Sequence, residues 1–152
     1  MVSLEKVPVI EVNTDNIVHL WPAILQAVQS ATFIAIDTEL SGLGNRRLLN
    51  AKAIDERYRH MCEVAGTRSM VALGISCFKL LPHSDAEVCN TDGKRQRLRK
   101  LYFQVQTYNV MLLCSEHYVV EPGSLRFLVE HGFDFNLQYA KGLPYRRGND
   151  KV

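Results

Sequence analysis

Two acidic residues, Asp37 and Glu39, end an apolar stretch of the sequence and could together hold a metal ion. The β-branched and aromatic run that leads into them, ATFIAI, predicts a buried β-strand. Side chains at positions i and i+2 of a strand point to the same face, so we expect the two carboxylates to lie side by side. Neighbouring carboxylates repel each other unless a cation lies between them. The pair is therefore a candidate metal site.

The oxygen atoms of this pair indicate which metal and which chemistry to expect. Carboxylates suit Mg²⁺ or Mn²⁺ better than Zn²⁺. Two such ions about 4 Å apart activate a water molecule and stabilise the leaving oxygen of a phosphodiester. The pattern Asp-x-Glu is short, however, and it also occurs by chance at the exposed ends of strands. Spacing alone therefore leaves two interpretations open, a metal site and an ordinary strand end.

The elements around the pair predict an α/β protein. Thr14, Asp15 and Asn16 are typical helix caps, and apolar residues then recur at helical spacing. This stripe consists of Ile17, Leu20, Trp21, Ile24, Leu25 and Val28. We expect helices over 50–65 and from Pro122 to Gly132 as well. Residues 69–78 and 101–114 predict two strands paired as an antiparallel hairpin, with the polar stretch 82–100 as its loop.

Basic residues gather in one place although the net charge of the 152-residue chain is only +2. The segment GKRQRLRK contains five of them, and Arg146 and Arg147 form a smaller pair. The five are Lys94, Arg95, Arg97, Arg99 and Lys100. Such runs bind phosphates or serve as nuclear import signals. More often they are solvated loops, so this alternative stays open.

The composition is that of a globular protein, with 47% hydrophobic and 22% charged residues. There is no repeat or break in composition, so we expect a single domain. No apolar run approaches the roughly 20 residues that span a bilayer, and the N-terminus has no hydrophobic signal segment. We therefore expect neither a membrane partner nor secretion. The four cysteines lack the short spacing of zinc sites, and we expect reduced thiols that are mostly buried.

Three ordered segments give a more specific signal than the acidic pair alone. FIAIDTELSGL resembles the first motif of the DEDD exonucleases, in the deadenylase branch that includes poly(A)-specific ribonuclease. ERYRHMCEVAGTRSMVALGISCFK and YNVMLLCSEHYVVEPGSLRFLVEHGFDFNLQYAKGLPY are similar to the same branch, and most similar to nuclear members that trim small nuclear RNA tails. The resemblance runs from about residue 6 to the end. It is weakest over 81–100, where the predicted loop is longer than the family implies.

The resemblance implies an RNase H-like fold, which is a mixed sheet flanked by helices, and two Mg²⁺ or Mn²⁺ ions. Asp37 and Glu39 match two of the four acidic family ligands, with Glu39 also orienting the attacking water. Leu40, Ser41 and Gly42 match the residues that contact the terminal nucleotide, although ordinary packing is an equal alternative for Leu40. The implied substrate is an RNA 3′ end, a poly(A) or small nuclear RNA tail, and the implied location is nuclear. Homo-oligomers are common in this branch.

The other family ligands find no match here. They are a second aspartate and a histidine followed a few residues later by a third aspartate. His131 precedes Asp134 by three residues, but this segment is not the catalytic motif of the family. The resemblance therefore implies that residues 1–152 are the N-terminal portion of one nuclease domain, inactive alone and with an unpaired sheet edge. The alternative function is a non-catalytic fragment that binds RNA through the basic run or pairs with a full-length relative.

Overall fold

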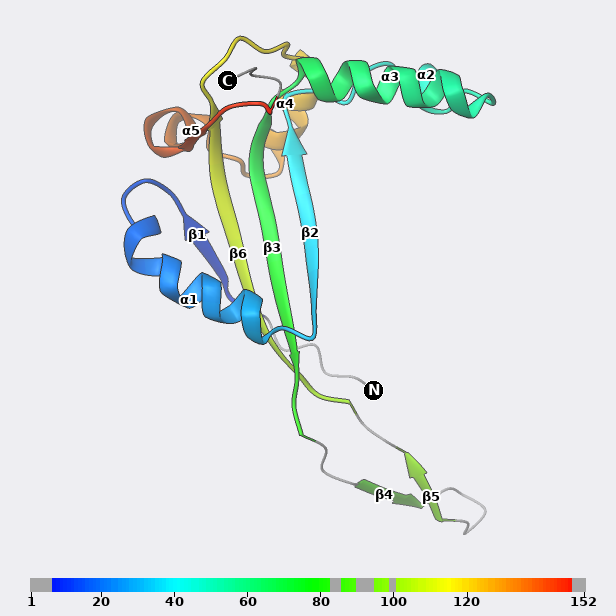
Figure 1. Cartoon of the computed structure of the whole chain (residues 1–152), viewed down its shortest axis with the longest axis vertical. Helices are drawn as coiled ribbons and strands as arrows, with labels where there is room; N and C mark the ends of the chain where they lie inside the picture. The colour runs from blue at the N-terminus through cyan, green and yellow to red at the C-terminus, as the bar shows by residue number, and fades with distance from the viewer. Residues whose placement is uncertain (1–6, 83–85, 90–94, 99–100, 149–152) are drawn as a thin grey trace.

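The computed structural model describes residues 7–82, 86–89, 95–98 and 101–148. At its centre is a mixed sheet with the strand order β1-β6-β3-β2 (Figure 1). The strands are β1 (Val9–Val12), β2 (Phe33–Leu40), β3 (Met70–Leu80) and β6 (Phe103–Cys114). β3 runs antiparallel to both β2 and β6, whereas β1 runs parallel to β6. The predicted α/β class and the predicted antiparallel pairing of the two long strands are confirmed.

Beyond β3 and β6 the chain forms a second, two-stranded sheet. β4 (Ala86–Cys89) pairs antiparallel with β5 (Arg95–Leu98). This hairpin projects past the lower end of the main sheet (Figure 1). The sequence predicted only a polar loop here, and the structure adds two strands. Of the basic run, Arg95 and Arg97 lie on β5, and the other three residues, Lys94, Arg99 and Lys100, lie outside the described residues.

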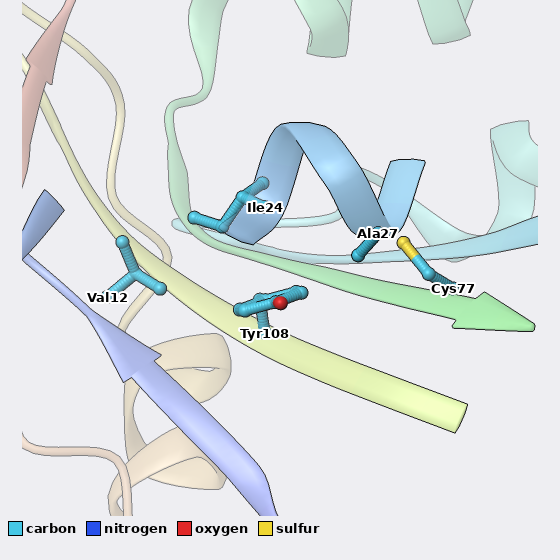
Figure 2. Packing of buried hydrophobic residues seen from close by; sticks show 5 residues of the cluster. All are labelled: Val12, Ile24, Ala27, Cys77 and Tyr108. Carbon is cyan, nitrogen blue, oxygen red and sulfur yellow. The ribbon is translucent and has the colours of Figure 1, made fainter. Parts of the chain in front are cut away.

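Helix α1 (Ile17–Ser30) covers one face of the main sheet. Its contact with the sheet is a buried apolar cluster (Figure 2). The cluster consists of Val12, Ile24, Ala27, Cys77 and Tyr108. The helix continues through Pro22, its sixth residue, although proline has no N–H to donate to the carbonyl of Val18 one turn earlier.

The apolar stripe predicted along α1 is divided by this packing. Ile24 is 5% exposed, whereas Trp21 is 51% exposed. Leu25 and Val28 are also exposed. Helical spacing therefore identified the helix correctly, but only one side of the apolar surface lies against the sheet in the part of the chain that the structure describes.

Strand β2 is exposed, and this corrects the prediction of a buried strand. Its first six residues are all exposed, and Ile36 is 69% exposed. Among the described residues, β2 hydrogen-bonds to β3 alone, so it forms an edge of the sheet. An apolar run predicts that a strand will form, but burial depends on the neighbours that the strand then acquires.

The remaining helices lie around the upper end of the sheet (Figure 1). They are α2 (Arg46–Leu49), α3 (Ile54–Thr67), α4 (Pro122–Glu130) and α5 (Phe135–Lys141), and a short strand β7 (Leu143–Tyr145) follows, parallel to β6. The helix predicted over 50–65 is present as α3, which begins at Ile54, and α2 is a short helix before it that was not predicted. Helix α4 begins at Pro122 as predicted, and Gly132 adopts a φ of 89° just after its end. None of the described helices combines the length and apolarity needed to cross a bilayer.

Candidate active site

Asp37 and Glu39 point to one face of the sheet, as their spacing predicts. On β3, Asp37 pairs with Gly74 and Glu39 with Ala72, and the register shift comes only afterwards, between Glu39 and Leu40. Cys77, which belongs to the α1 cluster, alternates with these positions on β3. The two carboxylates therefore lie on the face opposite α1.

Small residues on β3 leave room around the pair. Gly74 has no side chain, and a Cβ added there would be 3.6 Å from the Cβ of Asp37, which is ordinary contact. Asp37 is exposed and Glu39 partly buried. The backbone N–H of Thr38 donates to Oδ1 of Asp37 at 3.0 Å, which orients this carboxylate. The pair is thus accessible from the open face of the sheet.

Two hollows meet at Glu39. One, of about 570 Å³, is lined by Glu39, by Glu11 and Asn109 of the sheet, and by the α4–α5 connection including His131. Within it, Nδ2 of Asn109 donates to Oε2 of Glu11 at 2.8 Å.

The other hollow, of about 300 Å³, lies between the loop after Glu39 and helix α4. Leu40 and Leu43 form the loop side, and Ser124 and Phe127 are on the α4 side. Phe127 lines both hollows, is 55% exposed and packs on the His131 ring at a centroid distance of 4.1 Å. Apolar surface therefore lies directly beside a partly buried carboxylate.

Asp37 and Glu39 fit two of the ligand positions of a hard divalent ion. Both carboxylates offer oxygen donors, and within the described ranges no Lys or Arg forms a salt bridge with either. No group of three or more His, Cys, Asp or Glu side chains gathers as a metal site among the described residues. Mg²⁺ prefers near-octahedral oxygen coordination, so the pair supplies part of the shell and water or other donors must supply the rest.

The loop after Glu39 begins with a fully buried residue, Ser41. Its hydroxyl donates to the carbonyl of Val119 at 2.7 Å and accepts from the N–H of Ser69 at 3.0 Å. Its own backbone N–H donates to Ser69, and its carbonyl accepts from Glu121. Ser41 therefore anchors the loop inside the protein, while its contact with a nucleotide stays a prediction.

Glu121 holds the next part of the same loop. Its Oε1 accepts from the N–H of Gly44 at 2.9 Å and from Nε and Nη2 of Arg68 at 3.0 and 2.6 Å. Its Oε2 accepts from the N–H of Leu43 at 3.2 Å. The Arg68 guanidinium, followed by these amides, lowers the pKa of Glu121. The remaining predicted loop residue, Gly42, is buried against this carboxylate.

His60 fixes the far end of the loop. Its Nε2 accepts from the N–H of Asn45 at 3.0 Å, so the proton of the neutral ring is on Nδ1, which lies 3.4 Å from Oε2 of Glu63. His60 is 8% exposed, so its ring is buried between the loop and α3. Sequence reasoning missed Glu121, Arg68 and His60 as loop partners. No local pattern could reveal them, because Glu121 is 77 residues from Gly44 and 53 from Arg68.

A family model described as CAF1 family ribonuclease matches residues 12–152, nearly the whole chain. The chain belongs to the CAF1 ribonuclease family. It is 26% identical over 136 residues to an uncharacterised protein of Schizosaccharomyces pombe, covering 89% of this chain and 30% of that protein. It is 24% identical over 140 residues to the poly(A)-specific ribonuclease PARN of Danio rerio, and the match covers 89% of this chain and 20% of that protein. The pre-piRNA 3′-exonuclease trimmer of Bombyx mori is 24% identical over 145 residues, and the match covers 93% of this chain and 25% of that protein.

Solved structures of this CAF1 ribonuclease family show the same fold. The Mg²⁺- and Mn²⁺-bound form of S. pombe Pop2p has a TM-score of 0.61 and 16% identity, covering 90% of this chain and 48% of that one. The RNase domain of yeast Pop2 has a TM-score of 0.57 and 17% identity, and the match covers 90% of this chain and 43% of that one. The predicted mixed sheet with flanking helices is thus confirmed. The chain spans less than a third of these curated relatives and about half of these solved chains.

Proposed function

We propose that this chain supplies Asp37 and Glu39 as two metal ligands of a 3′-to-5′ exoribonuclease that shortens poly(A) or small nuclear RNA tails. The observation that carries the proposal is the placement of both carboxylates on one open face of β2, in a CAF1 ribonuclease. The name of the PARN relatives supports poly(A) as substrate. The sequence resemblance to the nuclear target-of-early-growth-response exonuclease supports small nuclear RNA tails.

In this proposal Asp37 and Glu39 would supply two of the ligands of two Mg²⁺ ions, with Mn²⁺ as an alternative. Bound ions of this kind activate water and stabilise charge on the leaving oxygen. Glu39 lies at the junction of the two hollows, where it can orient the attacking water toward the terminal phosphodiester. Attack of water on this phosphorus releases a nucleoside 5′-monophosphate and leaves a new 3′-hydroxyl on the RNA.

The smaller hollow is suited to the terminal nucleotide. Leu40 and Leu43 give it an apolar wall, and Phe127 offers an exposed ring on the other side. Stacking of a base on an aromatic side chain contributes about 1–3 kcal/mol. We thus predict that Leu40 and Gly42 shape the contact with the RNA 3′ end. Ser41 would anchor the loop that makes this contact.

The decisive experiment follows shortening of labelled oligo(A) by the full-length natural protein in Mg²⁺. We expect Asp37→Asn and Glu39→Gln each to slow the reaction by roughly 100-fold or more, since even residues behind a metal ligand cost 10–100-fold. Glu11→Gln is the matched control, because Glu11 lines the same hollow but is bonded to Asn109. An Mg²⁺-dependent rate that Asp37→Asn leaves unchanged would contradict the proposal.

A second candidate function is non-catalytic RNA binding by the β4–β5 hairpin. The observation in its favour is that this hairpin extends away from the main sheet and carries Arg95 and Arg97 (Figure 1). Phosphate contacts weaken steeply with salt. We expect RNA affinity that needs no metal, falls with salt and drops when Arg95, Arg97 and Arg99 become Ala. Unchanged affinity in that variant would make the basic run a solvated segment only.

We also propose that the protein is nuclear and that GKRQRLRK serves as its import signal. Replacing Lys94 and Arg95 by Ala in a fluorescent fusion should then leave the fusion in the cytoplasm. Unchanged nuclear fluorescence would contradict the assignment of GKRQRLRK as the import signal. Association with further copies of the chain or with a full-length relative is proposed from the family resemblance. Light scattering of the purified protein measures it directly.

A further inference from the structure

We propose that Glu121 and Arg68 are positioning residues that set the shape of the loop over residues 40–44 and thereby the affinity for the RNA 3′ end. The inference rests on the proposed function of Asp37 and Glu39. It adds two residues that touch neither the ions nor the RNA in that proposal. They act through the loop that follows Glu39.

The geometry concentrates four donors on a single carboxylate. Two are loop amides, Leu43 and Gly44, and two are guanidinium nitrogens of Arg68. Arg68 directly follows α3, and Glu121 directly precedes α4. One side chain therefore ties the loop to the ends of two helices.

This link joins the two walls of the hollow beside Glu39. The loop contributes Leu40 and Leu43 to one wall, and α4 contributes Phe127 to the other. Glu121 precedes α4 by one residue and bonds to the loop itself. The width of the hollow therefore depends on this carboxylate, and so does the position of a nucleotide relative to Glu39.

A charged carboxylate is needed here, because shape alone does not satisfy the donors. Both oxygens of Glu121 accept hydrogen bonds, whereas a Gln amide would direct its NH₂ group at one of the N–H donors. The side chain of Arg68 is 17% exposed, and loss of the carboxylate charge leaves this cation partly buried without its partner. A Gln substitution therefore loosens the loop while preserving side-chain size.

Two glycines show how closely the loop fits these partners. A Cβ at Gly42 would lie 2.5 Å from Cδ of Glu121, and one at Gly44 would lie 2.4 Å from Cγ2 of Val64. Gly44 also has a φ of 81°, which disfavours other residues. The Gly42 contact gives a second variant for the same test: Gly42→Ala displaces the same carboxylate that Glu121→Gln neutralises, so the two variants should behave alike.

The test measures kcat and KM of the full-length natural protein on oligo(A) in Mg²⁺. We expect Glu121→Gln and Gly42→Ala to raise KM by roughly tenfold, the loss of about one charged hydrogen bond, with a much smaller change in kcat. Glu116→Gln is the matched control. It disrupts another Arg–carboxylate pair of similar exposure, Arg147–Glu116 at 2.9 Å, in which Arg147 also donates to the carbonyls of Gly66 and His117. Equal KM changes in the Glu116 and Glu121 variants, or none in the latter, overturn the inference.

A second measurement separates this inference from the proposed function. Amide hydrogen exchange at Leu43 and Gly44 should accelerate in Glu121→Gln but not in Glu116→Gln. If the wild type and Asp37→Asn shorten oligo(A) at the same rate, the proposed function fails. The amide exchange rates alone then decide whether Glu121 holds the loop. Unchanged exchange at both amides overturns the inference whatever the activity.

Discussion

Asp37 and Glu39 share a face of β2, but their surroundings differ. Glu39 lines both hollows at the end of the strand, whereas Asp37 lies two residues earlier on β2, beside Gly74 and Ser76. Nearness to the apolar hollow places Glu39 where water and substrate would meet. The two roles that the family resemblance implies, an ion-holding aspartate and a glutamate that also orients water, stay predictions.

Glu121 should make the stability of the protein depend on acid pH. Its pKa in the folded state is lowered, chiefly by Arg68, so its ionised form stabilises the fold above the ordinary carboxyl pKa of about 4.3. This stabilisation is lost as the pH falls through the lowered folded pKa. We expect Glu121→Gln to reduce the free energy of unfolding at neutral pH by about 1–3 kcal/mol and to flatten its decline in acid. Urea unfolding at several pH values measures both effects.

The exposed Glu130 of α4 is the control for this prediction. Glu130→Gln should leave the free energy of unfolding and its pH dependence near the wild-type curve. A Glu121→Gln curve parallel to that of the wild type would show that the Arg68 pair does not contribute in the expected pH range.

The cysteines should differ sharply in reactivity. Cys62 is exposed, whereas Cys77 and Cys114 are buried, and burial raises the pKa of the Cys77 thiol. The expectation of mostly buried free thiols therefore holds for two of the three cysteines whose side chains the structure describes. We expect a thiol reagent to modify Cys62 quickly under native conditions and Cys77 only on unfolding, because the thiolate is the nucleophile. Rapid modification of Cys77, located by mass spectrometry, would contradict the structure.

At the scale of elements, the sequence signals were reliable where they are local. Helical spacing identified α1, Pro122 marked the start of α4, and alternation identified the long strands. The parallel pairing of β1 and β7 with β6 was not predicted, since it joins segments far apart in the chain. Nor did the apolar pattern of α1 indicate which side of the helix would be buried.

The two sides of α1 should therefore respond differently to truncation. Ile24→Ala removes a core side chain that is 5% exposed, and we expect a loss of about 2–5 kcal/mol in the free energy of unfolding. Val18→Ala on the exposed side should have little effect, because Val18 is 78% exposed. Denaturant unfolding of both variants tests the packing in Figure 2. Equal losses in the free energy of unfolding of the two variants would mean that another face of α1 packs against the sheet.

At the scale of the whole molecule, apolar surface remains exposed on the α1 side of the main sheet. Trp21 of α1 is 51% exposed, and Ile36, whose β3 partner Ile75 packs against the α1 cluster, is 69% exposed. Exposed apolar surface of this kind marks an interaction site or promotes aggregation. The open edge of β2 adds a strand that can pair with another chain.

We therefore expect the polypeptide of residues 1–152 to bind a hydrophobic dye and to self-associate. Trp21→Gln combined with Ile36→Thr should reduce both, as measured by dye fluorescence and light scattering. Tyr58→Gln is the control, since Tyr58 is 69% exposed but lies on α3, away from this surface. A monomeric polypeptide without dye binding would contradict the prediction.

The sequence by itself determined the strand that carries Asp37 and Glu39, their common face, the helices α1, α3 and α4, and the family resemblance. These features depend on neighbouring positions, because alternation, helical spacing and motifs are local. Tertiary structure alone decided that the exposed edge is β2, that Ser41 is buried and that Glu121 and Arg68 hold the loop. Such contacts join residues 28 to 78 positions apart, and only the register of the sheet and the packing of the helices bring them together.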